Sequence, residues 1–124
     1  MRLGDREFRR IVARALENIP DEIMRHVKNV AVTVRDRPWP ELLEEMGLPP
    51  DEPLFGVYTG VSLPEKSFTS PELMPDTIVI FKKPLLEWCR SLDELEDEIE
   101  ITVVHEIAHY FGISEERLAE LGYD

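Results

Sequence analysis

The first third of the chain passes from a helical to a strand-like pattern of apolar residues. From Asp5 onward, apolar side chains recur at steps of three and four, which predicts an amphipathic helix that ends before Pro20. A second, short helix is expected over residues 21–28. Valines then occupy every second position of residues 30–34, which is the spacing of a half-buried strand.

The middle of the chain predicts two further strands. Residues 41–46 favour one or two helical turns closed by a glycine. Residues 54–63, "LFGVYTGVSL", are rich in β-forming residues and predict a strand that turns or bulges at Gly60. Residues 76–81, "DTIVIF", are almost continuously apolar, so we expect this strand to be more central in the sheet. An exposed loop is expected between them, over residues 64–75.

The last third predicts a long helix with recognisable ends. A short helix over residues 84–89 comes first, and residues 91–94, "SLDE", have the form of a capping box. An apolar stripe continues from there, so the long helix runs through His109 and ends at Gly112. Ser114 can then cap a final short helix.

Length and composition predict one domain spanning residues 1–124, because two smaller units would each lack a sufficient core. The hydrophobic fraction of 43% and the charged fraction of 32% are ordinary for a soluble globular protein. No apolar run approaches the roughly 18 residues that span a bilayer, and the charged N-terminal segment lacks the apolar part of a secretion signal. We therefore expect a cytoplasmic protein without membrane association.

Charge and residue usage narrow the function further. The net charge of −12 argues against nucleic-acid binding, which needs a positive surface. Cys89 is the single cysteine, so a metal site must rely mainly on histidine and carboxylate ligands. The chain has no glutamine, two asparagines and ten prolines, which is typical of thermophilic proteins, so we expect a thermophilic source.

The motif His105-Glu106-Ile107-Ala108-His109 carries the clearest chemistry in the chain. Four residues of a helix rotate by about 400°, so His105 and His109 project from nearly the same face and can reach one ion. Glu106 lies about 100° around from His105, where it can contact a water on the metal without being a ligand. Bound zinc lowers the pKa of water from about 15.7 to about 7, and we expect Glu106 to act as general base.

A zinc site of this type needs a third protein ligand. In the extended pattern H-E-x-x-H-x-x-G-x-x-H, Gly112 stands at the glycine position and Glu115 at the third-ligand position. Glu116 competes for this role, and both carboxylates also suit the first turn of a capped helix. Two histidines and a carboxylate accept Fe²⁺, Co²⁺, Mn²⁺ and Ni²⁺ too, so the choice of Zn²⁺ follows the precedent of the motif.

Three stretches in order, covering about residues 54–123, carry a family resemblance: "LFGVYTGVSL", "MPDTIVIFKKPLLEW" and "TVVHEIAHYFGISEERLAELGY". Together they resemble the small bacterial zincin-like metallopeptidases, a minimal-zincin family formerly described as a domain of unknown function. The resemblance implies an α+β fold in which a small mixed β-sheet is packed by helices. It also implies a zinc site on the C-terminal HExxH helix.

The resemblance assigns roles by position. His105 and His109 match the two histidine ligands, Glu106 matches the catalytic glutamate, and Gly112 matches the turn glycine. Glu115 stands where the family looks to have an aspartate as third ligand. These matches imply a zinc-dependent metallopeptidase, and the alternative is a non-catalytic, metal-stabilised module that binds peptides or proteins.

The expected substrate is a peptide or protein. In zincins the edge strand of the sheet commonly binds peptide by β-addition, and residues 55–60 are the candidate here. Tyr58 in this strand is a candidate substrate-binding residue that could act as an electrophile for the oxyanion. Its other interpretation is a half-buried strand residue, since tyrosine is a common strand former. The oligomeric state stays open.

Overall fold

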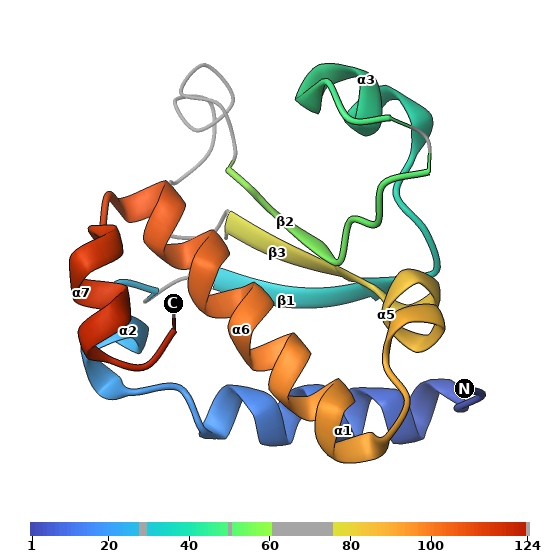
Figure 1. Cartoon of the computed structure of the whole chain (residues 1–124), viewed down its shortest axis with the longest axis horizontal. Helices are drawn as coiled ribbons and strands as arrows, with labels where there is room; N and C mark the ends of the chain where they lie inside the picture. Colours follow the sequence, from blue (N-terminus) through green and yellow to red (C-terminus); the bar gives the residue numbers. More distant parts are fainter. Residues whose placement is uncertain (28–29, 50, 61–75, 124) are drawn as a thin grey trace.

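The computed structural model describes residues 1–27, 30–49, 51–60 and 76–123. It has an α+β fold in which a three-stranded sheet is packed by helices (Figure 1). The elements in chain order are α1 (Asp5–Glu17), α2 (Asp21–Met24), β1 (Val30–Arg35), α3 (Pro40–Met46), β2 (Gly56–Thr59), β3 (Asp76–Phe81), α5 (Lys82–Trp88), α6 (Leu92–Phe111) and α7 (Glu115–Glu120).

The sheet is mixed, with the strand order β1-β3-β2. Strand β1 runs parallel to β3, whereas β2 runs antiparallel to it and places Tyr58 opposite Ile78. The nearly continuous apolar run of β3 is therefore central, as its sequence predicts. Strand β2 is an edge of the described sheet, and this edge faces the part of the molecule that carries the histidine motif.

The two faces of the sheet pack against different layers, because side chains alternate along a strand. Ile78 and Ile80 join the larger core, which also takes in the apolar sides of α1 and α6. Val79 and Phe81 point the other way and pack with Leu42 of α3 in a smaller cluster. Figure 1 shows α1 and α6 together on one side of the sheet and α3 on the other.

Helix α6 begins and ends where its sequence predicts. The Ser91 hydroxyl accepts a hydrogen bond from the backbone N–H of Glu94 at 3.1 Å. The Glu94 carboxylate accepts in return from the backbone N–H of Arg90 at 3.3 Å, one residue earlier than in an ideal capping box. The helix ends at Gly112, whose φ of 73° is a left-handed conformation that favours glycine. The histidine motif therefore occupies the last turns of α6.

Some predicted boundaries differ from the structure. Helix α2 ends at Met24 and so is shorter than the predicted helix over residues 21–28. Helix α5 begins at Lys82, before Pro84, which occupies a position in its first turn. Strand β2 ends at Thr59, and the predicted loop over residues 64–75 lies outside the described residues. Among the helices of the described part, none is long and apolar enough to cross a membrane.

Candidate metal site on helix α6

A cleft of about 730 Å³ lies along the C-terminal half of α6, between β2 and α7. It is lined by every residue to which the sequence assigns a role in the site, namely Tyr58, His105, Glu106, His109 and Glu115. Glu116, the competing third-ligand candidate, is exposed and is not among the lining residues. The fold thus brings the candidates from β2, α6 and α7 into one cavity.

His105 is half-buried and its ring is held by the end of the described chain. Its Nε2 atom lies 2.8 Å from the backbone carbonyl oxygen of Tyr123. Tyr123 is itself buried, and its hydroxyl donates to Oε2 of Glu100 at 2.6 Å. The ring of His105 is therefore held by Tyr123, whose own hydroxyl is bonded to Glu100 of the same helix.

Glu106 is also half-buried, and it is held by the edge strand. Its Oε1 atom accepts a hydrogen bond from the backbone N–H of Tyr58 at 2.8 Å. Burial raises the pKa of Glu106 above its ordinary value, while this hydrogen bond and the nearby His109 and His105 oppose the shift. A half-buried carboxylate beside two imidazoles, with a shifted pKa, is typical of functional sites.

The side chain of Tyr58 is engaged elsewhere. Its hydroxyl donates to Oδ2 of Asp76 at 3.0 Å, and burial raises the pKa of this hydroxyl. Its ring stacks on the ring of Tyr110, with centroids 4.0 Å apart and an interplanar angle of 21°. To act as an electrophile, the hydroxyl would have to leave Asp76, so that role stays a prediction. The observed link of Tyr58 to the site is its backbone N–H.

His109 and Glu115 form the exposed part of the site. Within the described residues, no three histidine, cysteine, aspartate or glutamate side chains come close enough together to form a metal-binding group. The two imidazoles and the carboxylate that line the cleft nevertheless match zinc in their chemistry. The cleft therefore has a suitable set of donors, which do not come together as a three-residue metal-binding group among the described residues.

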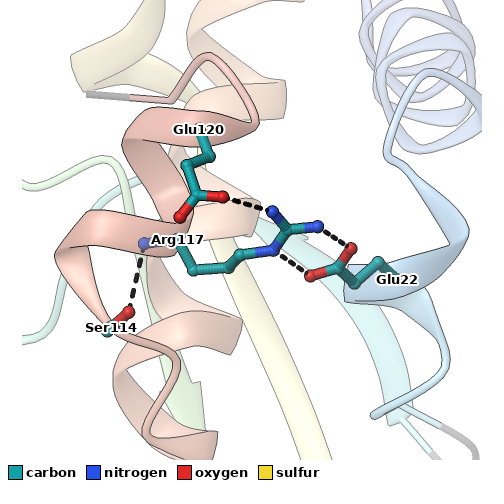
Figure 2. Close-up of polar contacts among 4 residues, drawn as sticks. All are labelled: Glu22, Ser114, Arg117 and Glu120. Carbon is teal, nitrogen blue, oxygen red and sulfur yellow. Dashed lines mark hydrogen bonds and ion pairs between the residues drawn. The ribbon is translucent and has the colours of Figure 1, made fainter.

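Helix α7, which begins at Glu115, is fixed to α2 by an arginine that the sequence did not single out (Figure 2). The guanidinium of Arg117 donates to both carboxylate oxygens of Glu22, and its Nη1 donates to Glu120 at 2.8 Å. The backbone N–H of Arg117 donates to the Ser114 hydroxyl at 3.1 Å, which caps the helix as predicted. This network holds α7, whose first residue is Glu115, against α2.

Sequence reasoning missed the contacts that orient the two anchored residues of the motif. Tyr123 acts on His105 through a backbone oxygen, and Tyr58 acts on Glu106 through a backbone nitrogen. Every residue type carries a backbone oxygen, and all but proline carry a backbone N–H, so no pattern of residue types reveals the contacts. Arg117 and Glu22 are a base and an acid 95 positions apart, and only the fold pairs them.

Comparisons with known proteins agree with this architecture. The sequence pattern of the zincin-like metallopeptidase family matches residues 27–123, and the chain belongs to this family. A conserved hypothetical protein from Thermus thermophilus has a similar fold, with a TM-score of 0.61 over 94% of this chain and 98% of that chain, at 23% sequence identity. No curated protein gave a significant match.

Proposed function

We propose that this protein is a zinc-dependent metallopeptidase in which Glu106 is the general base. The observation that supports this most is the position of Glu106 within the cleft. It is half-buried, held at one oxygen by the edge strand, and flanked along α6 by His105 and His109. Membership of the zincin-like metallopeptidase family supports zinc and peptide hydrolysis at the level of the family.

His105 and His109 would hold the ion, with Glu115 as the third ligand. The three side chains line one cleft, and they are of the types that zinc accepts. Glu115 and His109 are exposed, so their side chains can rotate without disturbing the core. When bound, zinc supplies a Lewis acid that polarises a carbonyl group and makes water a nucleophile near neutral pH.

The anchoring of Glu106 suits proton transfer. The Tyr58 N–H holds Oε1, which leaves Oε2 as the oxygen that can take a proton from the attacking water. Burial raises the pKa of Glu106, so its carboxylate is a stronger base than that of an exposed glutamate. After attack, the same carboxyl group would deliver the proton to the leaving amine.

The position of β2 supports an extended peptide as substrate. An edge strand can bind a peptide that adds as a further strand, through those of its backbone groups that are not already bonded; on β2 the N–H of Tyr58 is held by Glu106. Strand β2 is an edge of the described sheet, and Val57 and Tyr58 of this strand line the cleft beside Glu106. A peptide laid along β2 would therefore pass next to the proposed base.

The decisive experiment compares zinc-loaded wild-type protein with the Glu106→Gln variant on a library of short and unfolded peptides. We expect cleavage by the wild type and a loss of about 10²- to 10⁴-fold in the variant, because general-base catalysis contributes in this range. Glutamine keeps the size of the side chain, so the variant should retain its zinc. If zinc-loaded wild type cuts no peptide, the enzymatic proposal is wrong and the non-catalytic metal-binding module is favoured.

A further inference from the structure

A second pocket lies at the end of β2 that is away from the histidine motif. Its volume is about 480 Å³, which is within the range of ligand pockets. Leu54, two residues before β2, forms part of its wall, and Trp88 at the end of α5 forms another part. The remaining apolar lining residues are Leu43, Pro38, Pro53 and Pro84. The lining is therefore mainly apolar, and we call this site the Trp88 pocket.

The Trp88 side chain is unusually accessible. Its exposed fraction of 57% is the largest among the large apolar side chains of the described residues. Its ring lies against that of Phe55, with centroids 5.9 Å apart. The pocket wall also holds Arg37 and Glu87, whose side chains are joined by two hydrogen bonds of 3.3 and 2.5 Å. An exposed tryptophan beside a preformed pocket is typical of binding surfaces, because tryptophan dominates the energetics of many interfaces.

The charge around the pocket favours a basic partner. Arg37 and Glu87 neutralise each other, whereas Asp51 and Glu52 also line the pocket and are exposed. Within the described residues, neither Asp51 nor Glu52 takes part in an ion pair or a side-chain hydrogen bond. Their charge disfavours a second copy of this chain, which has a net charge of −12, and an anionic membrane surface. It attracts lysine and arginine.

The pocket lies where a peptide bound along β2 would extend from the cleft. The Phe55 carbonyl oxygen accepts from the backbone N–H of Phe81 at 2.9 Å, so the pairing of β2 with β3 continues to the residue after Leu54. Tyr58 lines the cleft, and at about 3.3 Å per residue Leu54 lies about 13 Å from it along the chain. Figure 1 shows β2 beginning on the side of α5 and running towards the end of α6.

We propose that the Trp88 pocket binds a peptide segment in which an apolar side chain stands between lysines or arginines. The apolar side chain covers the Trp88 ring, and the flanking cations meet Asp51 and Glu52. This segment belongs to the substrate, about four residues from the bond that is cut, given the rise of an extended chain. The assignment to the substrate rests on the proposed function, whereas the binding of the segment does not.

The first test measures binding by the fluorescence anisotropy of labelled peptides added to the full chain without zinc. The probe is an alanine-based peptide of about ten residues that contains Lys-Leu-Lys, and the two controls contain Glu-Leu-Glu or Lys-Ser-Lys at the same place. We expect the Lys-Leu-Lys peptide to bind about 10-fold more tightly than either control, a difference of about 1.4 kcal/mol. Equal affinities of the three peptides would overturn the proposal.

Variants of the protein test the pocket itself. Asp51→Asn/Glu52→Gln removes the two free charges, and Trp88→Ala removes the exposed ring. Glu44→Gln/Glu45→Gln is the matched control, because it removes two exposed acidic charges of α3 outside the pocket. We expect about 10-fold weaker binding in the first two variants and nearly wild-type binding in the control. If the two double variants bind equally well, the proposal is wrong.

Cleavage by the zinc-loaded protein separates this proposal from the proposed function. A substrate with Lys-Leu-Lys about four residues from the cut bond should have a KM about 10-fold lower than its Glu-Leu-Glu counterpart, at a similar kcat. Cleavage without this preference would overturn the role of the pocket and leave the peptidase standing. Binding of the Lys-Leu-Lys peptide without cleavage would overturn the proposed function and support the pocket as a docking site. A dimer that Trp88→Ala abolishes, without peptide binding, would overturn the proposal in favour of a second copy of the chain.

Discussion

The candidate site has an anchored half and an exposed half, which differ in how the fold holds them. His105 and Glu106 form the anchored half: both are half-buried, and each has a hydrogen bond to a backbone atom of a distant segment. His109 and Glu115 form the exposed half, and within the described residues neither side chain has a hydrogen-bond partner. The fold therefore orients one half and leaves the other to its ligand.

The two halves would therefore lose different amounts of side-chain freedom when a ligand binds. A side chain that the fold already orients loses little freedom when a ligand binds, whereas an exposed one loses up to about 2 kcal/mol of rotamer entropy. The proposed base is in the anchored half, where catalysis needs an accurate geometry. The exposed half contains a proposed metal ligand, His109, and the candidate third ligand, Glu115, whose convergence an ion itself could drive.

The largest expected effect is the stabilisation of the whole domain by zinc. At a free zinc concentration of about 100 times Kd, binding should raise the free energy of unfolding by about 2.7 kcal/mol. The His109→Ala variant should show almost none of this gain, because it removes a ligand and disturbs no buried group. Chemical denaturation with and without ZnSO₄ measures both values. An equal gain in the variant would show that zinc binds outside the motif.

The next largest effect is expected from a variant that disturbs the packing of β2 against α6, next to the anchored half. In Gly56→Ala the added Cβ would lie 3.0 Å from both Cγ2 of Thr102 and the backbone oxygen of Val79. The neighbouring atoms must then give by a few tenths of an ångström. We expect part of this to be a shift of α6 away from β2, which lengthens the hydrogen bond from Tyr58 to Glu106. We expect a loss of about 2 kcal/mol in stability, measured by urea denaturation, together with lower peptidase activity.

Thr102→Ser in the Gly56→Ala background is the control, because it removes the methyl group that clashes and leaves the contact with Val79. Part of the stability and activity should return. If Gly56→Ala unfolds like wild type and keeps full activity, the close approach of α6 to β2 does not orient Glu106.

A smaller effect separates the two roles of Tyr58. Tyr58→Phe removes the hydrogen bond to Asp76 but keeps the backbone N–H that holds Glu106. We expect a stability loss of about 1 kcal/mol, measured by thermal unfolding, with kcat/KM within a factor of a few of wild type. A fall of about 100-fold or more in kcat at unchanged KM would instead support the hydroxyl as an electrophile for the oxyanion.

The smallest effect concerns the hydrogen bonds between Arg117 of α7 and Glu22 of α2. The hydrogen bonds from Arg117 lower the pKa of Glu22 below the ordinary 4.5. A carboxyl group with a lowered folded pKa contributes stability above its unfolded pKa and loses it as pH falls through the folded value. Glu22→Gln should therefore unfold at a slightly lower temperature than wild type at about pH 7, and the difference should shrink below about pH 4.5. A difference that stays constant down to about pH 2 would contradict this ionic role.

The sequence predicted the long helix and its two ends well, because their determinants are local. Ser91, Gly112 and Ser114 are capping residues whose preferences follow from backbone geometry, and the spacing of His105 and His109 follows from the helical period. These signals need no knowledge of the rest of the chain. The central position of β3 could also be predicted from the sequence, since a strand buried on both faces is apolar throughout.

The contacts that orient the site could not be predicted. The link from Tyr58 to Glu106 depends on how α6 crosses β2, and a glycine at position 56 permits that approach. The link from Tyr123 to His105 uses a backbone oxygen placed by a turn and a buried ring. Whether Glu115 reaches the ion depends on side-chain rotation, which neither its position in the motif nor its place in the cleft decides.

The most direct test of the metal site is elemental analysis of protein reconstituted with zinc and then dialysed, for wild type, Glu115→Ala and the double variant His105→Ala/His109→Ala. We expect about one zinc per chain in wild type, a clear loss in Glu115→Ala, and almost none in the double variant. Equal zinc contents in wild type and the double variant would contradict the assignment of the histidine motif as the metal site.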